Sequence, residues 1–191
     1  MSYWVQHEDE YRRLEASVER IAAIGESDLF TRCLAGIEAA EADRVFCRHG
    51  FPHLLDVARI AWILNLERDC GLQRDVVYAA ALLHDIGRAA QYQTGEPHDE
   101  AGERIAAEVL DALPEPLRFD GVDRAAILHA VGGHRGFLAG REEDAHGGSA
   151  TADVLARLIK EADGRSRTCF FCAARGACYW PEERKNLSID I

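Results

Sequence analysis

The sequence predicts an all-helical fold, and three observations lead to that prediction. Apolar residues recur at helical spacing through most of the 191 residues, no segment alternates polar and apolar residues as a strand does, and glycine or proline separates the periodic segments. We expect helices over the ranges 3–24, 27–45, 52–66, 74–84, 97–113, 120–132 and 149–164. Glycine-rich loops are expected at 87–96 and 132–148, and a cysteine-containing tail follows residue 164.

Each predicted helix rests on an apolar stripe or a recognisable first residue. The first carries a stripe of residues spaced three or four apart, namely Tyr11, Leu14, Val18 and Ile21. Side chains that cap helices open three others, and proline in the first turn opens two more. These residues are Ser27, Asp120 and Ser149 as caps, with Pro52 and Pro97 as first-turn prolines.

Composition narrows the class of protein. The chain is 48% hydrophobic, which is enough for a sizeable core in one domain. Its net charge of −11 argues against general binding to nucleic acid or anionic membranes. The stretch 164–187 is locally basic, with five Arg or Lys against two Glu, a balance of 5 − 2 = +3. Such a patch is typical of a solvated face or of a site for an anionic ligand.

No signal peptide and no membrane-spanning run of about 18 apolar residues is evident, so we expect a cytoplasmic protein. In that compartment the six cysteines are expected as free thiols or metal ligands instead of disulfides. His7 and His146 are expected at the surface.

Several ionisable residues share the apolar face of a predicted helix. His53 lies on the stripe of Val57 and Leu64, and Asp163 lies on the stripe of Ile159. His84 and His98 follow the same pattern in their own helices. Since burying a lone carboxylate costs several kcal/mol or more, we predict that these groups converge on shared cations. Imidazole with carboxylate suits iron, manganese, zinc or magnesium-type sites.

His84 and Asp85 are adjacent, which adds a geometric constraint. Neighbours in a helix point about 100° apart, so both reach one centre only near a helix end. Ile86 and Gly87 supply that end, with glycine expected to stop the helix. His134 lies just past another breaker, Gly132-Gly133.

These residues resemble the pattern of the HD superfamily, which is an upstream His, then His-Asp, then a distant Asp. The segment Leu-Leu-His84-Asp85-Ile-Gly-Arg is similar to the family's core motif, with Arg88 where lysine is usual. The resemblance spans residues 44–168, so we expect N-terminal helices (1–43) packing on the domain and a tail (169–191). The order of motifs is nearest to bacterial dinucleoside polyphosphate hydrolases. No Gly-Tyr-Pro signature of the branch that cleaves cyclic dinucleotides follows.

The resemblance implies an HD-type helical bundle that hydrolyses a small phosphoester, with a nucleotide expected as the substrate. It implies one or two divalent metal ions. The first would be held by His53, His84, Asp85 and Asp163, and Asp85 would bridge to a second held by His98 and His134. His129 is the alternative for the last position.

In such a site two cations neutralise phosphate oxygens and acidify a bound water. Asp85 would hold the pair and accept the proton of the water. The guanidinium fork suits phosphate oxygens, so the candidates for substrate binding are Arg88, Arg135, Arg165 and Arg167. Arg88 is the first choice, since it lies one turn from the expected metals. A surface salt bridge is the alternative for each of these arginines.

The tail contains Cys169-x2-Cys172-x5-Cys178, a spacing typical of a metal knuckle or a redox pair. Zinc usually takes four ligands, so Cys47 or His49 would supply the fourth if the tail folds back. An iron–sulfur cluster and plain free thiols are the alternatives.

Two other functional classes compete with hydrolysis. The HD scaffold also resembles that of di-iron oxygenases such as myo-inositol oxygenase, which use a similar ligand cage. A non-catalytic metal-binding module is the third reading, although the complete ligand set favours an enzyme.

Overall fold

A computed structural model of the chain describes residues 8–133 and 150–189. Within these residues the secondary structure is helical and contains no strand, which confirms the predicted all-α class. The helices are α2 (Glu8–Glu26), α3 (Asp28–Ala40), α4 (Phe51–Glu67), α5 (Arg74–Leu83), α6 (Arg88–Thr94), α7 (His98–Asp111), α8 (Gly121–Gly133) and α9 (Ala150–Ser166). None of the described helices is long and apolar enough to cross a membrane.

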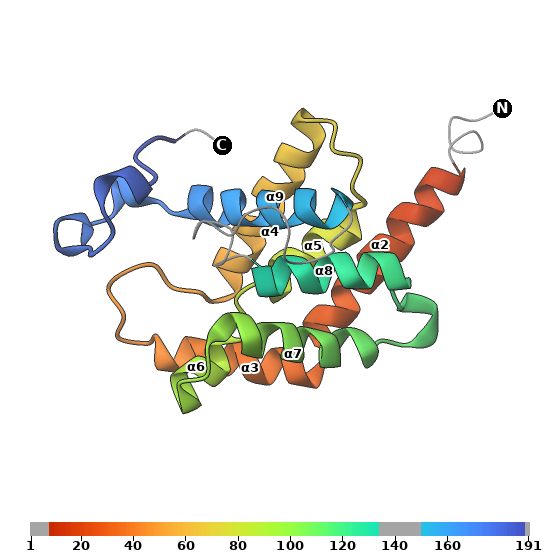
Figure 1. The fold of residues 1–191 in the computed structure, drawn as a ribbon, viewed down its shortest axis with the longest axis horizontal. Helices are drawn as coiled ribbons and strands as arrows, with labels where there is room; N and C mark the ends of the chain where they lie inside the picture. Colours follow the sequence, from red (N-terminus) through yellow and green to blue (C-terminus); the bar gives the residue numbers. More distant parts are fainter. Residues whose placement is uncertain (1–7, 134–149, 190–191) are drawn as a thin grey trace.

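Helix α5 lies at the centre of the bundle. It packs against α2, α4, α8 and α9, and α4 and α8 both pack against α9 (Figure 1). Nearly every residue of α5 is buried, including the run from Ala79 to Leu83. An amphipathic stripe would not predict this pattern, because a helix surrounded on all sides is apolar all round. The end of α5 therefore opens into the middle of the molecule.

A second layer is formed by α3, α6 and α7, which contact one another along one side of the bundle (Figure 1). The prediction of a loop over 87–96 was wrong, since Arg88–Thr94 form helix α6. Only seven residues form this helix, too few to show a periodic stripe. Gly95 ends it with a φ of 79°, a left-handed conformation that glycine adopts without strain.

Helix α3 is shorter than expected. Ser27 accepts a hydrogen bond from Phe30 N, as predicted for a cap. The helix ends at Ala40 instead of Val45, and residues 41–50 form a loop that leads to α4. This loop carries several side chains of the site.

Helix α2 buries a different part of its surface from the one predicted. Leu14 and Val18 are 42% and 55% exposed, whereas Ile24 is fully buried. Figure 1 shows why, since the N-terminal half of α2 projects beyond the bundle. The C-terminal half is anchored by an ion pair between Arg20 and the buried Asp75.

The chain after α9 folds back toward the 41–50 loop. It forms three single-turn 3₁₀ segments, η3 (Cys169–Phe171), η4 (Arg175–Ala177) and η5 (Glu182–Arg184). The Phe170 amide donates to Asn186 O, and the Asn186 side chain donates to Arg165 O. The ring of Tyr179 meets that of Phe46 edge to face, with centroids 6.4 Å apart.

Candidate metal centre

The His84-Asp85 pair lies in the turn that follows α5. Helix α5 ends at Leu83, and α6 begins at Arg88, so both side chains belong to a helix end as their adjacency predicts. They are 1% and 2% exposed. Since α5 is the central helix, its end delivers an imidazole and a carboxylate to the interior.

Four imidazoles turn their Nε2 atoms toward Asp85. Oδ2 of this carboxylate lies 3.4 Å from His84, 3.6 Å from His53 and 4.0 Å from His49. Oδ1 lies 3.9 Å from His98. The imidazoles come from the 41–50 loop, from α4, from the turn after α5 and from α7. Their convergence therefore depends on the whole bundle.

In His84 and in His53 the other ring nitrogen, Nδ1, has a hydrogen-bond partner. His84 Nδ1 lies 2.7 Å from Ala81 O, an acceptor, so this nitrogen must carry the proton. Ser166 Oγ donates its single proton to Asp163 O at 2.8 Å, and it therefore accepts from His53 Nδ1 at 3.2 Å. In a neutral imidazole both assignments leave the lone pair on Nε2, which faces Asp85.

His49 and His98 have similar partners. His49 Nδ1 lies 2.6 Å from Glu41 Oε1, and His98 Nδ1 lies 3.1 Å from Gln91 Oε1. Burial lowers the pKa of His49 even though its hydrogen bond to Glu41 acts in the opposite direction. The ring is therefore neutral at pH 7 and presents a lone pair on Nε2.

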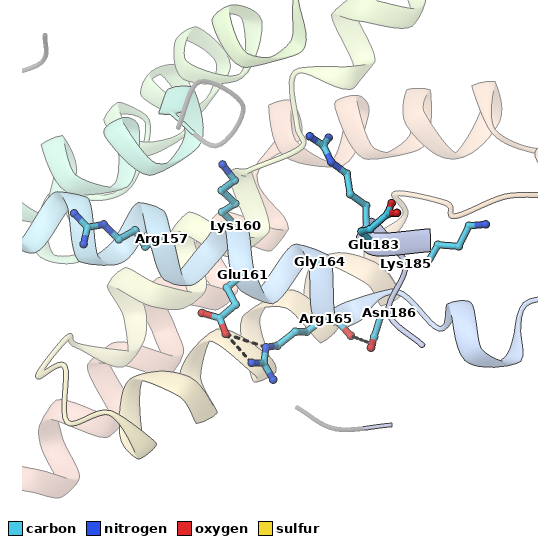
Figure 2. Close-up of a pocket in the computed structure, with 9 residues that line it drawn as sticks. Arg157, Lys160, Glu161, Gly164, Arg165, Glu183, Lys185 and Asn186 are labelled. Atoms are coloured by element: carbon cyan, nitrogen blue, oxygen red, sulfur yellow. Dashed lines mark hydrogen bonds and ion pairs between the residues drawn. The ribbon is translucent and has the colours of Figure 1, made fainter. Parts of the chain in front are cut away.

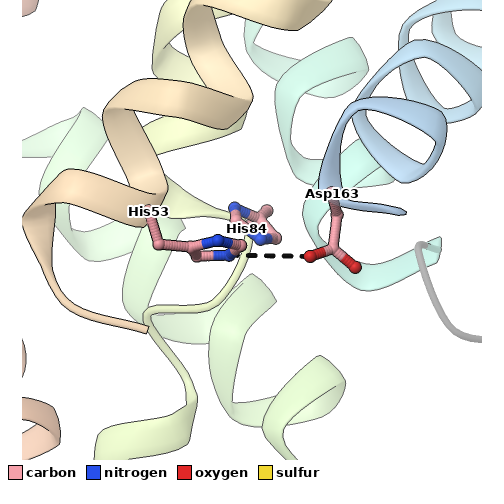
Figure 3. Close-up of side chains that lie close together, drawn as sticks. All are labelled: His53, His84 and Asp163. Atoms are coloured by element: carbon pink, nitrogen blue, oxygen red, sulfur yellow. Dashed lines mark ion pairs between the residues drawn. The ribbon is translucent and has the colours of Figure 1, made fainter. Parts of the chain in front are cut away.

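Asp163 completes the centre from α9. Its Oδ1 lies 3.6 Å from His53 Nε2 (Figure 3). Ligand atoms of His53, His84 and Asp163 all lie within 4.8 Å of one another. The Nε2 atom of His53 is buried without a hydrogen-bond partner among the described residues, a costly state for a polar atom unless an ion occupies the space. The donor set therefore fits a divalent cation.

Both carboxylates are held in the ionised form. Burial acts to raise the pKa of Asp85, but His84, His53 and Arg88 outweigh it and hold that pKa well below its usual value. Arg88 Nε lies 2.8 Å from Asp85 Oδ1. The pKa of Asp163 is likewise lowered against the effect of burial, chiefly by Arg167, whose guanidinium lies 2.8 Å from Oδ2. Ionised oxygens are the form that binds metal ions.

Gly87 allows α7 to approach the His-Asp turn. A Cβ at this position would lie 2.0 Å from His98 O and 2.4 Å from Gly102 N. The φ of Gly87 is −67°, a conformation that any residue adopts. This glycine therefore does not stop the helix through a left-handed conformation, as we had predicted. Glycine is required here because any side chain would push away the backbone that carries His98.

A cavity of about 620 Å³ opens onto this centre. Five basic side chains line it, although the chain as a whole carries a net charge of −11. Burial, together with the neighbouring Arg184, lowers the pKa of Lys160. The cavity is lined by Arg44, Arg88, Lys160, Arg167 and Arg184 beside His49, Asp85, His98 and Asp163, with Phe46, Tyr179 and Trp180 on the side of the tail.

The predicted phosphate-binding arginines are divided between two places. Arg88 and Arg167 line the cavity of the centre. Arg165 instead bonds Glu161 at 2.9 Å and lines a separate depression along α9 (Figure 2). This is the surface salt bridge that was its alternative reading. Arg135 lies outside the described residues, as do His134, His7 and His146.

Two of the weaker candidates lie elsewhere. His129, the alternative ligand, has its Nε2 3.1 Å from Asp153 Oδ1 on the neighbouring helix α9. The cysteines of the tail are free thiols, with Cys169 buried and Cys172 and Cys178 half-buried. Among the described residues, His53, His84 and Asp163 form the one group of three metal-ligating side chains whose ligand atoms all lie within 4.8 Å of one another.

His49, Glu41 and Tyr92 were missed as members of the centre. The Glu41 carboxylate accepts hydrogen bonds from the backbone amide and the ring Nδ1 of His49. It also accepts one from the Tyr92 hydroxyl at 2.5 Å. His49 lies in a loop, where no periodicity reveals which way a side chain points. Its position four residues before His53, next to the start of a helix, was the available signal.

Comparison with known proteins agrees with this geometry. The HD domain matches residues 50–168. The chain is 35% identical over 149 residues to an uncharacterized protein of Clostridium beijerinckii, an alignment that covers 78% of this chain and 84% of the relative. No solved structure gives a significant match. The matched region contains His53, the His84-Asp85 pair and Asp163, so the chain belongs to the HD domain family.

Proposed function

We propose that this protein is a metal-dependent phosphohydrolase that acts on a small phosphoester, with a nucleotide as the substrate class. The observation that carries the proposal is the convergence of four imidazoles on an ionised, buried Asp85, each with its Nδ1 next to an acceptor. Metal-binding histidines in proteins show this arrangement. The HD domain family supports the hydrolytic class.

His53, His84, Asp85 and Asp163 would hold the first ion. The two oxygens of Asp85 face different imidazoles, with His98 on the side of Oδ1. This division favours Asp85 as a bridge to a second ion bound by His98 and by His134, which lies outside the described residues. Bound divalent ions would supply an acidified water and offset the negative charge of the phosphate.

The side chains of the cavity perform the remaining tasks. Arg88 holds Asp85 through Oδ1, which keeps the carboxylate ionised and able to bind metal ions. Arg88 pairs with Asp85, and Arg167 pairs with Asp163. Both arginines would orient phosphate oxygens through their guanidinium groups. An anion would also relieve the repulsion between Lys160 and Arg184.

The aromatic side of the cavity favours a nucleotide among the phosphoesters. Tyr179 and Trp180 stack on each other with centroids 5.3 Å apart, and Tyr179 is 69% exposed. The exposed ring of Tyr179 beside these cations suits a nucleobase joined to phosphate, since base stacking on an aromatic side chain contributes about 1–3 kcal/mol. The order of motifs also resembles that of dinucleoside polyphosphate hydrolases, which places dinucleotides in the test panel.

The test is phosphate release by metal-loaded protein from mononucleotides, dinucleoside polyphosphates and a generic phosphoester. Asp85→Asn should lower kcat by at least about 100-fold, whereas Asp111→Asn, which changes an exposed Asp paired with Arg124, should leave it unchanged. Absence of hydrolysis over the whole panel with Mg²⁺, Mn²⁺, Fe²⁺ or Zn²⁺ would contradict the proposal. Oxygen consumption with bound iron would instead establish an oxygenase.

A further inference from the structure

Four of the six cysteines lie at the end of the molecule where the tail meets the 41–50 loop. Cys47 is in that loop, and Cys169, Cys172 and Cys178 are in the tail. The two segments lie at the same end of the bundle (Figure 1). Cys47 and Cys169 are 169 − 47 = 122 residues apart in the sequence, so only the fold brings the two segments together.

Three observations place Cys47 among the cysteines of the tail. Cys47 and Cys178 line the same cavity, and the residues beside them, Phe46 and Tyr179, are in ring contact. Burial raises the pKa of Cys47, and the nearby thiols of Cys169 and Cys172 add to the effect. Cys47 therefore lies within electrostatic reach of two tail cysteines and shares a wall with the third.

The structure also decides between the two candidates for a fourth ligand. His49 Nδ1 bonds Glu41, and its Nε2 lies 4.0 Å from Asp85, so this ring belongs to the His/Asp centre. Cys47 is two residues earlier and faces the tail. The set that remains is Cys47, Cys169, Cys172 and Cys178.

We propose that these four cysteines bind a structural zinc ion, separate from the His/Asp centre. A Cys-x2-Cys pair plus two further cysteines from elsewhere in the fold is the usual composition of a closed, four-thiolate zinc site. On binding, the four thiols release four protons to solvent and the sulfurs bond Zn²⁺ as thiolates. A site of four thiolates and one Zn²⁺ has a net charge of 2 − 4 = −2.

The surroundings suit that charge and allow the sulfurs to close on the ion. Arg167 acts on Cys47 electrostatically, and Arg44 Nε bonds Cys47 O at 2.8 Å. Within the described residues, no three of these sulfurs all lie within 4.8 Å of one another. Their segments are single 3₁₀ turns joined by irregular chain, which rearrange at lower cost than a packed helix.

The zinc site would fix one wall of the catalytic cavity. Tyr179 and Trp180 follow Cys178 directly in the chain, and Arg184 comes shortly after them. All three line the cavity that contains Asp85. Zinc bound by the tail and the loop would hold these residues against the His/Asp centre. Loss of the zinc should therefore loosen the tail even when no substrate is present.

The experiment measures zinc in the purified full chain and in three variants. Cys169→Ser with Cys172→Ser should lose about one equivalent of zinc. The matched control, Cys33→Ser with Cys70→Ser, changes the two cysteines outside the set and should retain it. Cys172→His should also retain zinc, because imidazole replaces a thiolate in such sites. Cobalt substitution should give a thiolate-to-cobalt absorption band in the wild type and the control, and not in the double tail variant.

Two further readouts separate this proposal from the hydrolase proposal and from misfolding. Asp85→Asn should keep the cobalt–thiolate band, and the double tail variant should retain wild-type helical circular dichroism while its tail is cleaved faster by trypsin. Equal zinc content and equal cobalt–thiolate absorption in the wild type and the double tail variant would overturn the proposal. Iron with acid-labile sulfide, lost in the same variant, would overturn the assignment to zinc.

Discussion

Each imidazole around Asp85 is oriented by a different acceptor, and these acceptors are scattered in the sequence. Ser166, Ala81 O, Glu41 and Gln91 serve His53, His84, His49 and His98 respectively. Their shared effect is to place the Nδ1 proton away from the centre and the Nε2 lone pair toward it. The acceptors are therefore as much a part of the centre as the residues that would touch the metal.

Ser166 provides the cleanest test of this idea. Ser166→Ala removes the acceptor of His53 Nδ1 and should weaken metal binding roughly 10- to 100-fold, the usual effect of losing such a partner. Metal titration by calorimetry measures the change. Ser27→Ala is the matched control, since it removes the cap of α3 and should cost about 1 kcal/mol of stability without changing metal affinity. Unchanged affinity in Ser166→Ala would show that this contact does not orient the ring.

Glu41 predicts a dependence of stability on acid. Burial acts to raise the pKa of Glu41, but hydrogen bonds from His49 and Tyr92 lower it from 4.5 to about 2. Because the folded-state pKa lies below the unfolded value, the stabilisation is complete above pH 4.5 and is lost as pH falls toward 2. A shift of this size corresponds to about 3 kcal/mol.

The free energy of unfolding of Glu41→Gln should therefore lie below that of the wild type by about 3 kcal/mol at pH 7. The difference should shrink between pH 4.5 and pH 2. Urea denaturation followed at several pH values measures it, with Glu182→Gln as the control, since that carboxylate is 57% exposed. A difference that stays constant across this range would contradict the account of Glu41.

At the residue scale, the sequence identified the side chains that lie on periodic stripes and missed those that do not. His53 and Asp163 were found because each follows an apolar stripe on its own helix. His49 and Glu41 lie outside the helices, where no periodic pattern indicates the direction of a side chain. The position of Arg167 near Asp163 could be predicted from the sequence, since the two residues are four apart and share a helix face. Arg165 is two residues after Asp163 and points about 200° away from it.

At the scale of elements, the site depends on how closely α7 approaches the turn after α5. Gly87 faces His98 O and Gly102 N at distances that exclude a Cβ. The backbone atoms at this contact belong to a buried helix and cannot give way as a flexible side chain can. The lack of a side chain at Gly87 therefore allows helix α7, and His98 at its start, to lie this close to the turn.

Gly87→Ala should destabilise the protein by about 3 kcal/mol or more, because backbone on both sides of the contact must move. Gly25→Ala, at a position in α2 with open space around a Cβ, should be neutral or slightly stabilising. Thermal and urea denaturation compare the two variants. Equal stability of the two would show that the approach of α7 is less close than the structure indicates.

The sequence predicted the long helices and failed for the short one. Helices with a full apolar stripe or a recognisable first residue, such as α4, α7 and α9, lie close to their expected ranges. Helix α6 has only seven residues and lies between two glycines, a pattern that equally suits a loop. Its existence depends on packing between α3 and α7, which a single sequence does not display.

At the scale of the whole molecule, the chain separates its charges. It carries a net charge of −11, yet the cavity beside Asp85 gathers five basic side chains. Arg167 and Arg184 come from the basic stretch 164–187, whose excess of positive charge was visible in the sequence. The sequence could not show that the stretch folds back over the site, because no periodic pattern governs the tail. A basic cavity in an acidic protein favours small anionic ligands over nucleic acid.

The central claim is that imidazoles and carboxylates from separate helices bind divalent metal at one place. Crystals of the metal-loaded protein, measured at the absorption edge of the bound metal, test it directly through anomalous difference density. The account predicts density within bonding distance of His53 Nε2, His84 Nε2 and the carboxylates of Asp85 and Asp163. Metal-loaded crystals with no anomalous density among these four side chains would contradict it.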